Sequence, residues 1–206
     1  MNTIRFAGSS ALSLESSVQF ALWDLVRESI ASLTDRLQQF AQRSDFTEQM
    51  TIAFGGSPSG LQQAWSDGLV TVPNIEIRNQ SELNGALGAF AASENKIYLA
   101  WEFVQNSDRS ALESVVLEEY GHYLDSLINP IDSAGDEGAI FAAIVQGVEL
   151  SSQELESLRA EDDTAVVNLD GESVAIEQAN EPSADEQYML ELLNRMRINP
   201  AADLIC

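Results

Sequence analysis

The sequence predicts an α+β domain over residues 1–179, in which a small mixed sheet with an edge hairpin packs on a long helix. Two patterns support this fold class. Apolar residues recur at three- and four-residue steps from about Leu14 to Gln42, which indicates a long amphipathic N-terminal helix. Short alternating runs then precede a return to helical spacing, and 45% of the 206 residues are hydrophobic, enough for a substantial core.

The region after the first helix is predicted to change from helix to sheet. Met50–Phe54 fits a strand or a helix, and a short helix follows near Leu61–Trp65. Ile75–Arg78 alternates like a strand, and Gly88–Ala91 with Lys96–Ala100 reads as a hairpin. We expect this last strand to lead through a short polar loop into the next helix.

Three helices and a second hairpin are predicted in the remainder of the domain. The first helix begins near Asp108 or Ser110 and ends at about Ile128, because Asn129-Pro130 cannot continue it. The next begins at Gly135–Gly138 and runs through Val145, and Ser151–Glu154 caps a third. The hairpin joins Thr164–Leu169 to Ser173–Glu177 through a turn of the Asp-Gly type.

Composition restricts the partners of this chain. Ten basic against 33 acidic residues give a formal charge of −23, which makes nucleic acid an unfavourable partner and cations favourable ones. No apolar run approaches the roughly 20 residues that span a bilayer, so no membrane insertion is expected. The only cysteine is Cys206, so any metal must be held by carboxylates and imidazole. The sequence leaves the oligomeric state open.

The chemistry of the predicted long helix centres on Glu118-Glu119-Tyr120-Gly121-His122. Glu118 and His122 are four residues apart, so both side chains could reach one ion, and Glu119 could act as general base on a bound water. Gly121 would let a substrate or a neighbouring strand approach closely. If this site is catalytic, we expect zinc as the cofactor and a peptide or protein as the substrate.

A third metal ligand is expected from outside this run. Glu137 is the first choice because it begins the next apolar helix, and Asp136 is the near alternative. Asp125 could be a direct ligand or could orient the imidazole of His122. Calcium is the alternative metal, because carboxylate oxygens suit a hard cation.

A simpler interpretation gives these residues no metal. Glu118, Glu119, His122 and Asp125 would then form the solvated side of an ordinary amphipathic helix, opposite a predicted apolar face that includes Leu127. The domain would be a noncatalytic interaction or folding module. A dry, well-packed helix without a cleft beside His122 would favour this second function.

The motif is similar to the His-Glu-x-x-His helix of the zincin metallopeptidases, with Glu118 where that family has its first histidine. This similarity implies a zincin-like fold in which Glu119 is the base and His122 a metal ligand. With Gly135–Phe141, the motif also resembles an N-terminal module of large cyanobacterial repeat proteins of the haemolysin type. That resemblance implies an extracellular, calcium-binding context and export without an N-terminal signal peptide, and none is visible here.

The C-terminal residues form a separate unit in the sequence. Residues 180–184 are acidic and small, which is typical of a linker, and residues 185–206 read as a helical stub. The segment Ser183–Arg197, continued by Asn199–Ala202, resembles the opening helix of a CAP domain (cysteine-rich secretory, antigen 5, pathogenesis-related 1). Only the start of such a domain is present, so the resemblance implies a longer multidomain protein and assigns no CAP function.

Overall fold

A computed structural model describes residues 4–6, 16–129 and 135–179 of the chain, and these residues have the predicted α+β fold. The predicted linker and C-terminal stub lie outside the described residues. The elements, in chain order, are β1 (Ile4–Phe6), α1 (Ser16–Ala41), α2 (Phe46–Phe54), α3 (Leu61–Ser66), β2 (Asn74–Arg78), the 3-10 helix η2 (Gln80–Leu83), β3 (Gly88–Ala91), β4 (Lys96–Ala100), α4 (Trp101–Asn106), α5 (Arg109–Ile128), α6 (Glu137–Gln146), α7 (Ser152–Leu158), β5 (Thr164–Leu169) and β6 (Glu172–Ala179).

The six strands form one mixed sheet in the order β1-β2-β4-β3-β6-β5. Strands β1, β2 and β4 run parallel, whereas β3 is antiparallel to both β4 and β6. The predicted hairpins β3–β4 and β5–β6 are both present. In the second hairpin Asp170 and Gly171 have φ values of 55° and 91°, the left-handed conformations that an Asp-Gly turn of type I′ requires.

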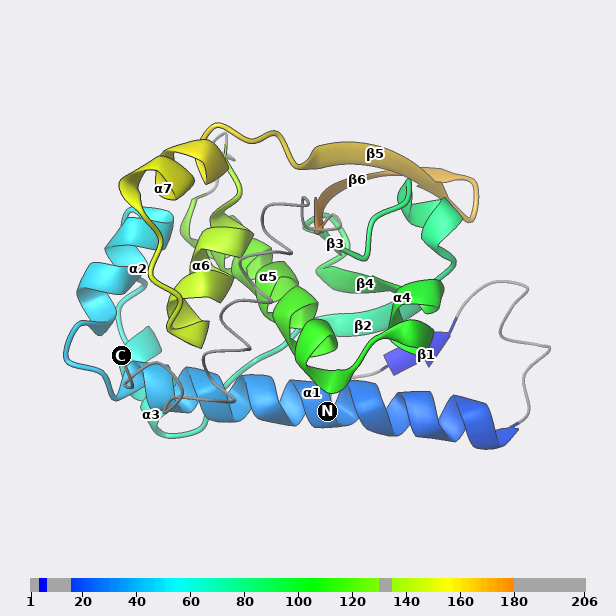
Figure 1. The fold of residues 1–206 in the computed structure, drawn as a ribbon, viewed down its shortest axis with the longest axis horizontal. Helices are drawn as coiled ribbons and strands as arrows, with labels where there is room; N and C mark the ends of the chain where they lie inside the picture. Colours follow the sequence, from blue (N-terminus) through cyan, green and yellow to red (C-terminus); the bar gives the residue numbers. More distant parts are fainter. Residues whose placement is uncertain (1–3, 7–15, 130–134, 180–206) are drawn as a thin grey trace, which may run out of the picture.

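Helix α5 lies between the sheet and the other helices (Figure 1). It contacts β3 and β6 on one side and α1 and α6 on the other. Its N-terminus is capped by Asp108, whose side chain accepts a hydrogen bond from the Ala111 N–H. Because α5 is covered on all these sides, its buried residues include the polar Glu119, His122 and Asp125 as well as apolar ones.

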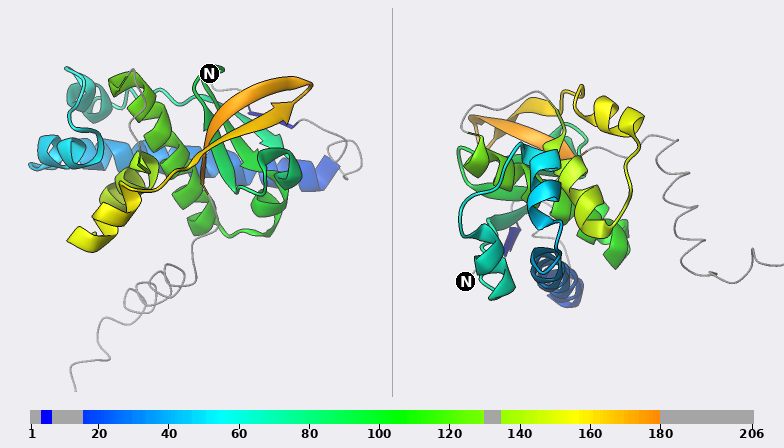
Figure 2. Two further views of the ribbon diagram at one scale, coloured as in Figure 1. Left: turned by 90° about the horizontal axis from the view of Figure 1, so that it is seen from above. Right: turned by 90° about the vertical axis from the view of Figure 1, so that its left-hand side faces the viewer.

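Two hydrophobic clusters hold the layers together. The larger one joins α1, α2, α5 and α6 to one face of the sheet. The smaller one lies on the opposite face, where Val167, Leu169, Val174 and Ile176 of the β5–β6 hairpin pack on residues of β3 and β4 such as Tyr98. The hairpin therefore curls over the sheet, as the view from above shows (Figure 2).

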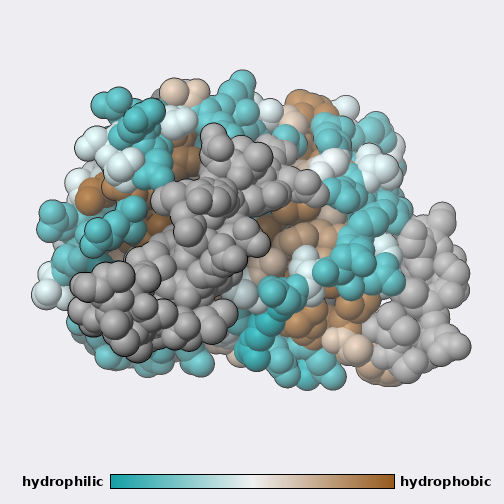
Figure 3. Space-filling model, in the orientation of Figure 1, coloured by the Kyte–Doolittle hydropathy of each residue, from teal (hydrophilic) through white to brown (hydrophobic). Residues whose placement is uncertain are grey.

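On the face shown in Figure 3, hydrophilic residues occupy much of the outline, and hydrophobic residues are visible in several separate patches between them. Among the described residues, no helix is both long and apolar enough to cross a membrane.

Two sequence predictions need correction. The strand at Lys96–Ala100 does not lead through a polar loop to the long helix, because the short helix α4 follows it directly. The predicted faces of α5 are also wrong at several positions: Glu119, His122 and Asp125 are buried, whereas Leu127 is 59% exposed. The face interpreted as solvated is covered by neighbouring elements, because α6 and β6 pack against it.

Candidate metal centre

His122, on α5, lies at the centre of a buried group of carboxylates and is only 1% exposed. Its Nδ1 lies 2.9 Å from Glu177 Oε2. Its Nε2 lies 3.4 Å from Asp163 Oδ2 and 3.7 Å from Asp136 Oδ1. The chain therefore brings side chains of α5, β6, the start of α6 and the residue before β5 together around its single histidine.

Several polar atoms in this group have no hydrogen bond among the described residues. They are both ring nitrogens of His122 and Oδ2 of Asp163, all fully buried. The Glu177 oxygen is close enough to pair with Nδ1, but the two do not have the geometry of a hydrogen bond. A buried polar atom without a hydrogen bond is costly and rare, and it is expected where an ion or a water completes the site.

Two sets of these side chains could hold a metal ion. Glu118, His122 and Asp136 form one set, and His122, Asp163 and Glu177 form the other. Within each set the potential ligand atoms all lie within 4.8 Å of one another. Carboxylate oxygens and an imidazole nitrogen are a suitable donor set for zinc and similar divalent ions.

The close crossing of α5 and α6 positions the first set. Gly121 faces Gly138 there, and a Cβ on Gly121 would lie 2.7 Å from the Gly138 Cα. The neighbour that Gly121 admits is thus a helix and not the predicted strand or substrate. Asp136 caps the N-terminus of α6, where Oδ1 accepts from the Ala139 N–H at 2.7 Å. The cap fixes this carboxylate beside His122.

The charges in the group perturb one another strongly. Burial, followed by the charge of Asp136, raises the pKa of Glu118 to about 8. Burial also raises the pKa of Asp163 to about 7, although His122 acts against it. Burial alone would lower the pKa of His122, but Glu177, Glu119 and Asp136 more than offset it, so that pKa lies well above its ordinary value. The four carboxyl groups around His122 can therefore carry more negative charge than one imidazolium neutralises.

Glu119, the predicted general base, belongs to neither set. Its carboxyl is fully buried against the sheet, where Oε1 accepts a hydrogen bond from the Ala179 N–H at 3.1 Å. Gly88 leaves the space for it, because a Cβ there would lie 2.7 Å from Glu119 Oε1. Burial raises the pKa of this carboxyl well above its usual value, although the charge of His122 acts against it. The hydrogen bond to Ala179 directs the carboxyl towards β6.

Substitution of Glu119 tests this structural role. At pH 7.5 we expect Glu119→Gln to keep the stability of the wild type, because the amide oxygen can still accept from Ala179. We expect Glu119→Ala to lower the free energy of unfolding by about 2 kcal/mol, because the Ala179 N–H is left without a partner in the interior. Urea denaturation of both variants measures the difference. An equal loss in both would show that the carboxylate charge itself is required.

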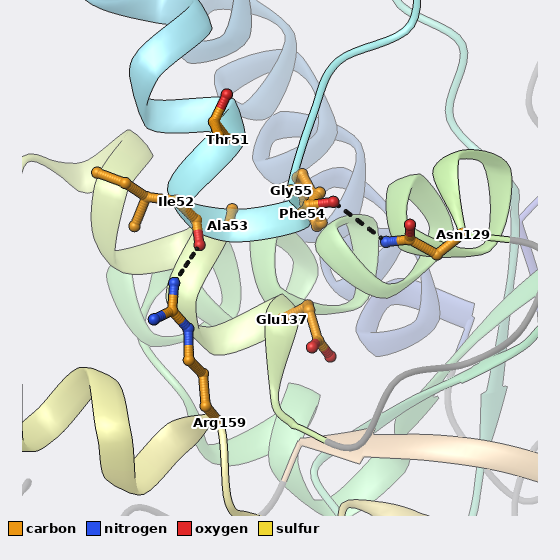
Figure 4. A pocket seen from close by; sticks show the side chains of 8 residues that line it. All are labelled: Thr51, Ile52, Ala53, Phe54, Gly55, Asn129, Glu137 and Arg159. Carbon is orange, nitrogen blue, oxygen red and sulfur yellow. Dashed lines mark hydrogen bonds between the residues drawn. The ribbon is translucent and has the colours of Figure 1, made fainter.

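Two other predicted site residues, Glu137 and Asp125, belong to neither metal set. Glu137 lines a pocket at the end of α2, together with Asn129 and Arg159 (Figure 4). Asp125 accepts a hydrogen bond from Asn129 Nδ2 at 2.6 Å, and the same amide donates to the Phe54 carbonyl. The structure thus groups Asp136, and not Glu137, with Glu118 and His122, and it gives Asp125 a partner at the C-terminal end of α5.

The sequence prediction missed Asp163 and Glu177. Asp163 stands in the acidic run Glu161-Asp162-Asp163, where nothing in the sequence separates the buried member from its exposed neighbours. For Glu177 the sequence contained one weak indication of its position, the alternation of residues along β6. In β6 the buried Val174 and Ile176 share one face, so strict alternation places Glu177 and Ala179 on the other, which faces α5.

Together, the fold and the site define an α+β domain with a buried carboxylate–imidazole group that could hold a metal ion. Comparison of the chain with protein-family models, curated proteins and solved structures finds no match. The geometry around His122 is therefore the basis for any functional inference.

Proposed function

We propose that this domain binds one divalent metal ion through Glu118, His122 and Asp136, and that the ion has a structural and noncatalytic role. The observation that carries the proposal is the buried imidazole whose two nitrogens have no hydrogen bond among the described residues, amid carboxylates on several elements. A divalent cation at Nε2 would give this nitrogen a partner and would offset the negative charge of the nearby carboxylates, while Nδ1 faces Glu177.

Zinc suits the site better than calcium. Calcium takes six to eight oxygen ligands and seldom uses nitrogen. Here the imidazole is the central group. The carboxylates of Asp163 and Asp136 lie 3.4 and 3.7 Å from its Nε2, and Glu118 belongs to the same set as His122 and Asp136. One imidazole with a few carboxylates is a donor set typical of zinc or another first-row metal.

Two features support a structural role over peptide hydrolysis. Catalytic zinc sites keep one position open to water and substrate, whereas His122 and Asp163 are 1% and 4% exposed. In addition, the carboxyl of Glu119 accepts a hydrogen bond from the Ala179 N–H of β6 and belongs to neither metal set. We therefore propose a zincin-related module without peptidase chemistry. Its exported, repeat-protein setting is a proposal that rests on the sequence resemblance alone.

Zinc binding to the purified chain, measured by competition with a chromophoric chelator, tests the proposal. We expect one bound zinc per chain, and we expect His122→Ala to lower the affinity at least about 100-fold, because it removes the only nitrogen ligand. Calcium should compete weakly. A wild-type chain that binds no zinc, or a His122→Ala chain that binds it as tightly, would exclude the site.

Asp136→Asn provides a second test that is gentler on folding. Asparagine also caps helices well, so α6 should keep its N-terminus while the site loses one carboxylate. We expect this change to weaken zinc binding about tenfold. Asp108→Asn is the matched control, because Asp108 caps α5 in the same way and belongs to neither metal set. Equal effects of the two substitutions would assign the loss to capping.

A further inference from the structure

The same ion has a consequence for the β5–β6 hairpin. We infer that Asp163 is a ligand of this ion, so that the metal links the start of β5 to α5 and α6. In the same inference, Glu177 positions the imidazole of His122. This inference rests on the proposed metal site and extends it from the helices to the sheet. It makes the hairpin the metal-dependent part of the domain.

Asp163 has the position of a metal ligand and a side-chain oxygen without a hydrogen bond among the described residues. It lies directly before β5, and its backbone carbonyl accepts a hydrogen bond from the Gln178 N–H at 3.1 Å, which ties it to β6. Its side chain is 5% exposed, and Oδ2 has no hydrogen bond among the described residues. That oxygen lies 3.4 Å from His122 Nε2. A single ion between the two atoms would satisfy both.

In the described part of the chain, a short strand pairing joins the hairpin to the sheet at this end, and the Leu87 N–H also donates to the Ala179 carbonyl at 2.9 Å. Strand β6 pairs with β3 through three residue pairs only, Gly88↔Ala179, Ala89↔Gln178 and Phe90↔Glu177. The rest of the hairpin continues beyond β3 and packs through the smaller hydrophobic cluster (Figure 2). Short pairing of this kind opens more readily than the long helical core.

Like charges meet at the same place. Glu118 and Asp136 belong to the helices, whereas Asp163 and Glu177 belong to the hairpin, and all four surround one imidazole. Where carboxylates of both pairs are ionised at the same time, they repel one another across the boundary between the hairpin and the helices. With the cation, both pairs are attracted to the same charge, and the two layers close together.

Glu177 acts through His122. Its carboxylate lies 2.9 Å from Nδ1, on the side of the ring away from Asp163 and Asp136. When a metal ligand is an imidazole, its other nitrogen commonly donates to a carboxylate that holds the ring in place. Glu177 is therefore a positioning residue, and Nε2 is the atom that faces the metal.

Hydrogen exchange of the full chain, with zinc or with chelator, tests the inference. At zinc concentrations near 100 times the dissociation constant, we expect amides of residues 163–179 to exchange up to about 100-fold more slowly than with chelator. Amides of α1 that exchange through local opening, faster than global unfolding, serve as the internal reference and should change much less. Equal slowing in both regions would show that zinc stabilises the whole fold without a specific effect on the hairpin, and would overturn the inference.

Asp163→Asn and Asp162→Asn form a matched pair of variants. Asp162 is exposed and belongs to neither metal set, so its substitution should leave zinc affinity and hairpin exchange unchanged. Asp163→Asn should weaken zinc binding at least about tenfold and abolish the zinc-dependent protection of the hairpin. Protection of α1 in the same spectra reports whether each variant is folded.

Glu177 is tested by rescue. Glu177→Ala should lower zinc affinity about 10- to 100-fold, and Glu177→Gln, which keeps an oxygen acceptor for Nδ1–H, should recover most of it. If the wild type binds zinc but Asp163→Asn retains full affinity and protection, the metal site stands and the inference fails. If the wild type binds no zinc, the proposed function fails as well.

Discussion

Replacement of Phe141 by alanine is expected to lower the free energy of unfolding by about 3–5 kcal/mol, the usual cost of removing a buried aromatic ring. Phe141 is 1% exposed and lies at the centre of an aromatic cluster. Its ring centroid is 5.3 Å from that of Phe54 and 6.4 Å from that of Tyr120, and it also contacts Phe40 and Trp65. These rings come from α1, α2, α3 and α5, so a cavity at Phe141 would weaken the packing of all four helices.

Phe20→Ala is the matched control for this change. Phe20 lies on α1 and is 70% exposed, so the same atoms are removed without leaving a cavity. We expect its effect to be within about 0.5 kcal/mol. Urea denaturation of both variants gives the comparison. A loss below 1 kcal/mol for Phe141→Ala would contradict the packing of α6 against α2, α3 and α5.

The longer elements of the fold could be predicted because their periodicity is strong. The expected helix at Leu14–Gln42 is confirmed as α1, and the expected end at Asn129-Pro130 is confirmed for α5. Strand β1 and helix α4 were missed. They have three and six residues, which is too short for either period to stand out. The ambiguous Met50–Phe54 proved helical, as part of α2.

The candidate site was predictable only in part, because its side chains come from elements that are far apart in the sequence. Glu118 and His122 are one helical turn apart, so helix geometry alone brings them together. Asp163 and Glu177 reach His122 through the pairing of β6 with β3, which is a long-range contact that no local pattern specifies. Glu137 was preferred over Asp136 because sequence spacing does not show which of two adjacent acidic residues at the start of a helix faces His122.

Burial of the polar face was the main feature that the sequence could not show. Amphipathic spacing predicts one covered face, yet α5 is covered by α6 and β6 on its polar side as well. The two glycines at the α5–α6 crossing allow this, because their missing side chains let the backbones approach. The second expected large effect follows from that close approach.

Gly138→Ala is expected to lower the free energy of unfolding by about 2 kcal/mol and to weaken zinc binding. A Cβ at this position would collide with Nε2 of His122 and would lie 2.7 Å from the Glu118 backbone carbonyl. The carbonyl is part of α5 and cannot move alone, so α6 must shift away from it. Overpacking of a rigid contact costs about 1–3 kcal/mol or more, which exceeds the gain in helix propensity of about 1 kcal/mol.

Gly56→Ala provides the control, because a Cβ there meets no atom within 4 Å and its φ is not in the left-handed region. We expect it to leave both stability and zinc affinity unchanged. Urea denaturation with chelator measures the effect of Gly138→Ala on packing, and chelator competition measures its effect on the site. Wild-type stability in Gly138→Ala would mean that α6 does not cross α5 at Gly121. Because the shift of α6 carries Asp136 away from His122, zinc affinity should fall even where the variant remains folded.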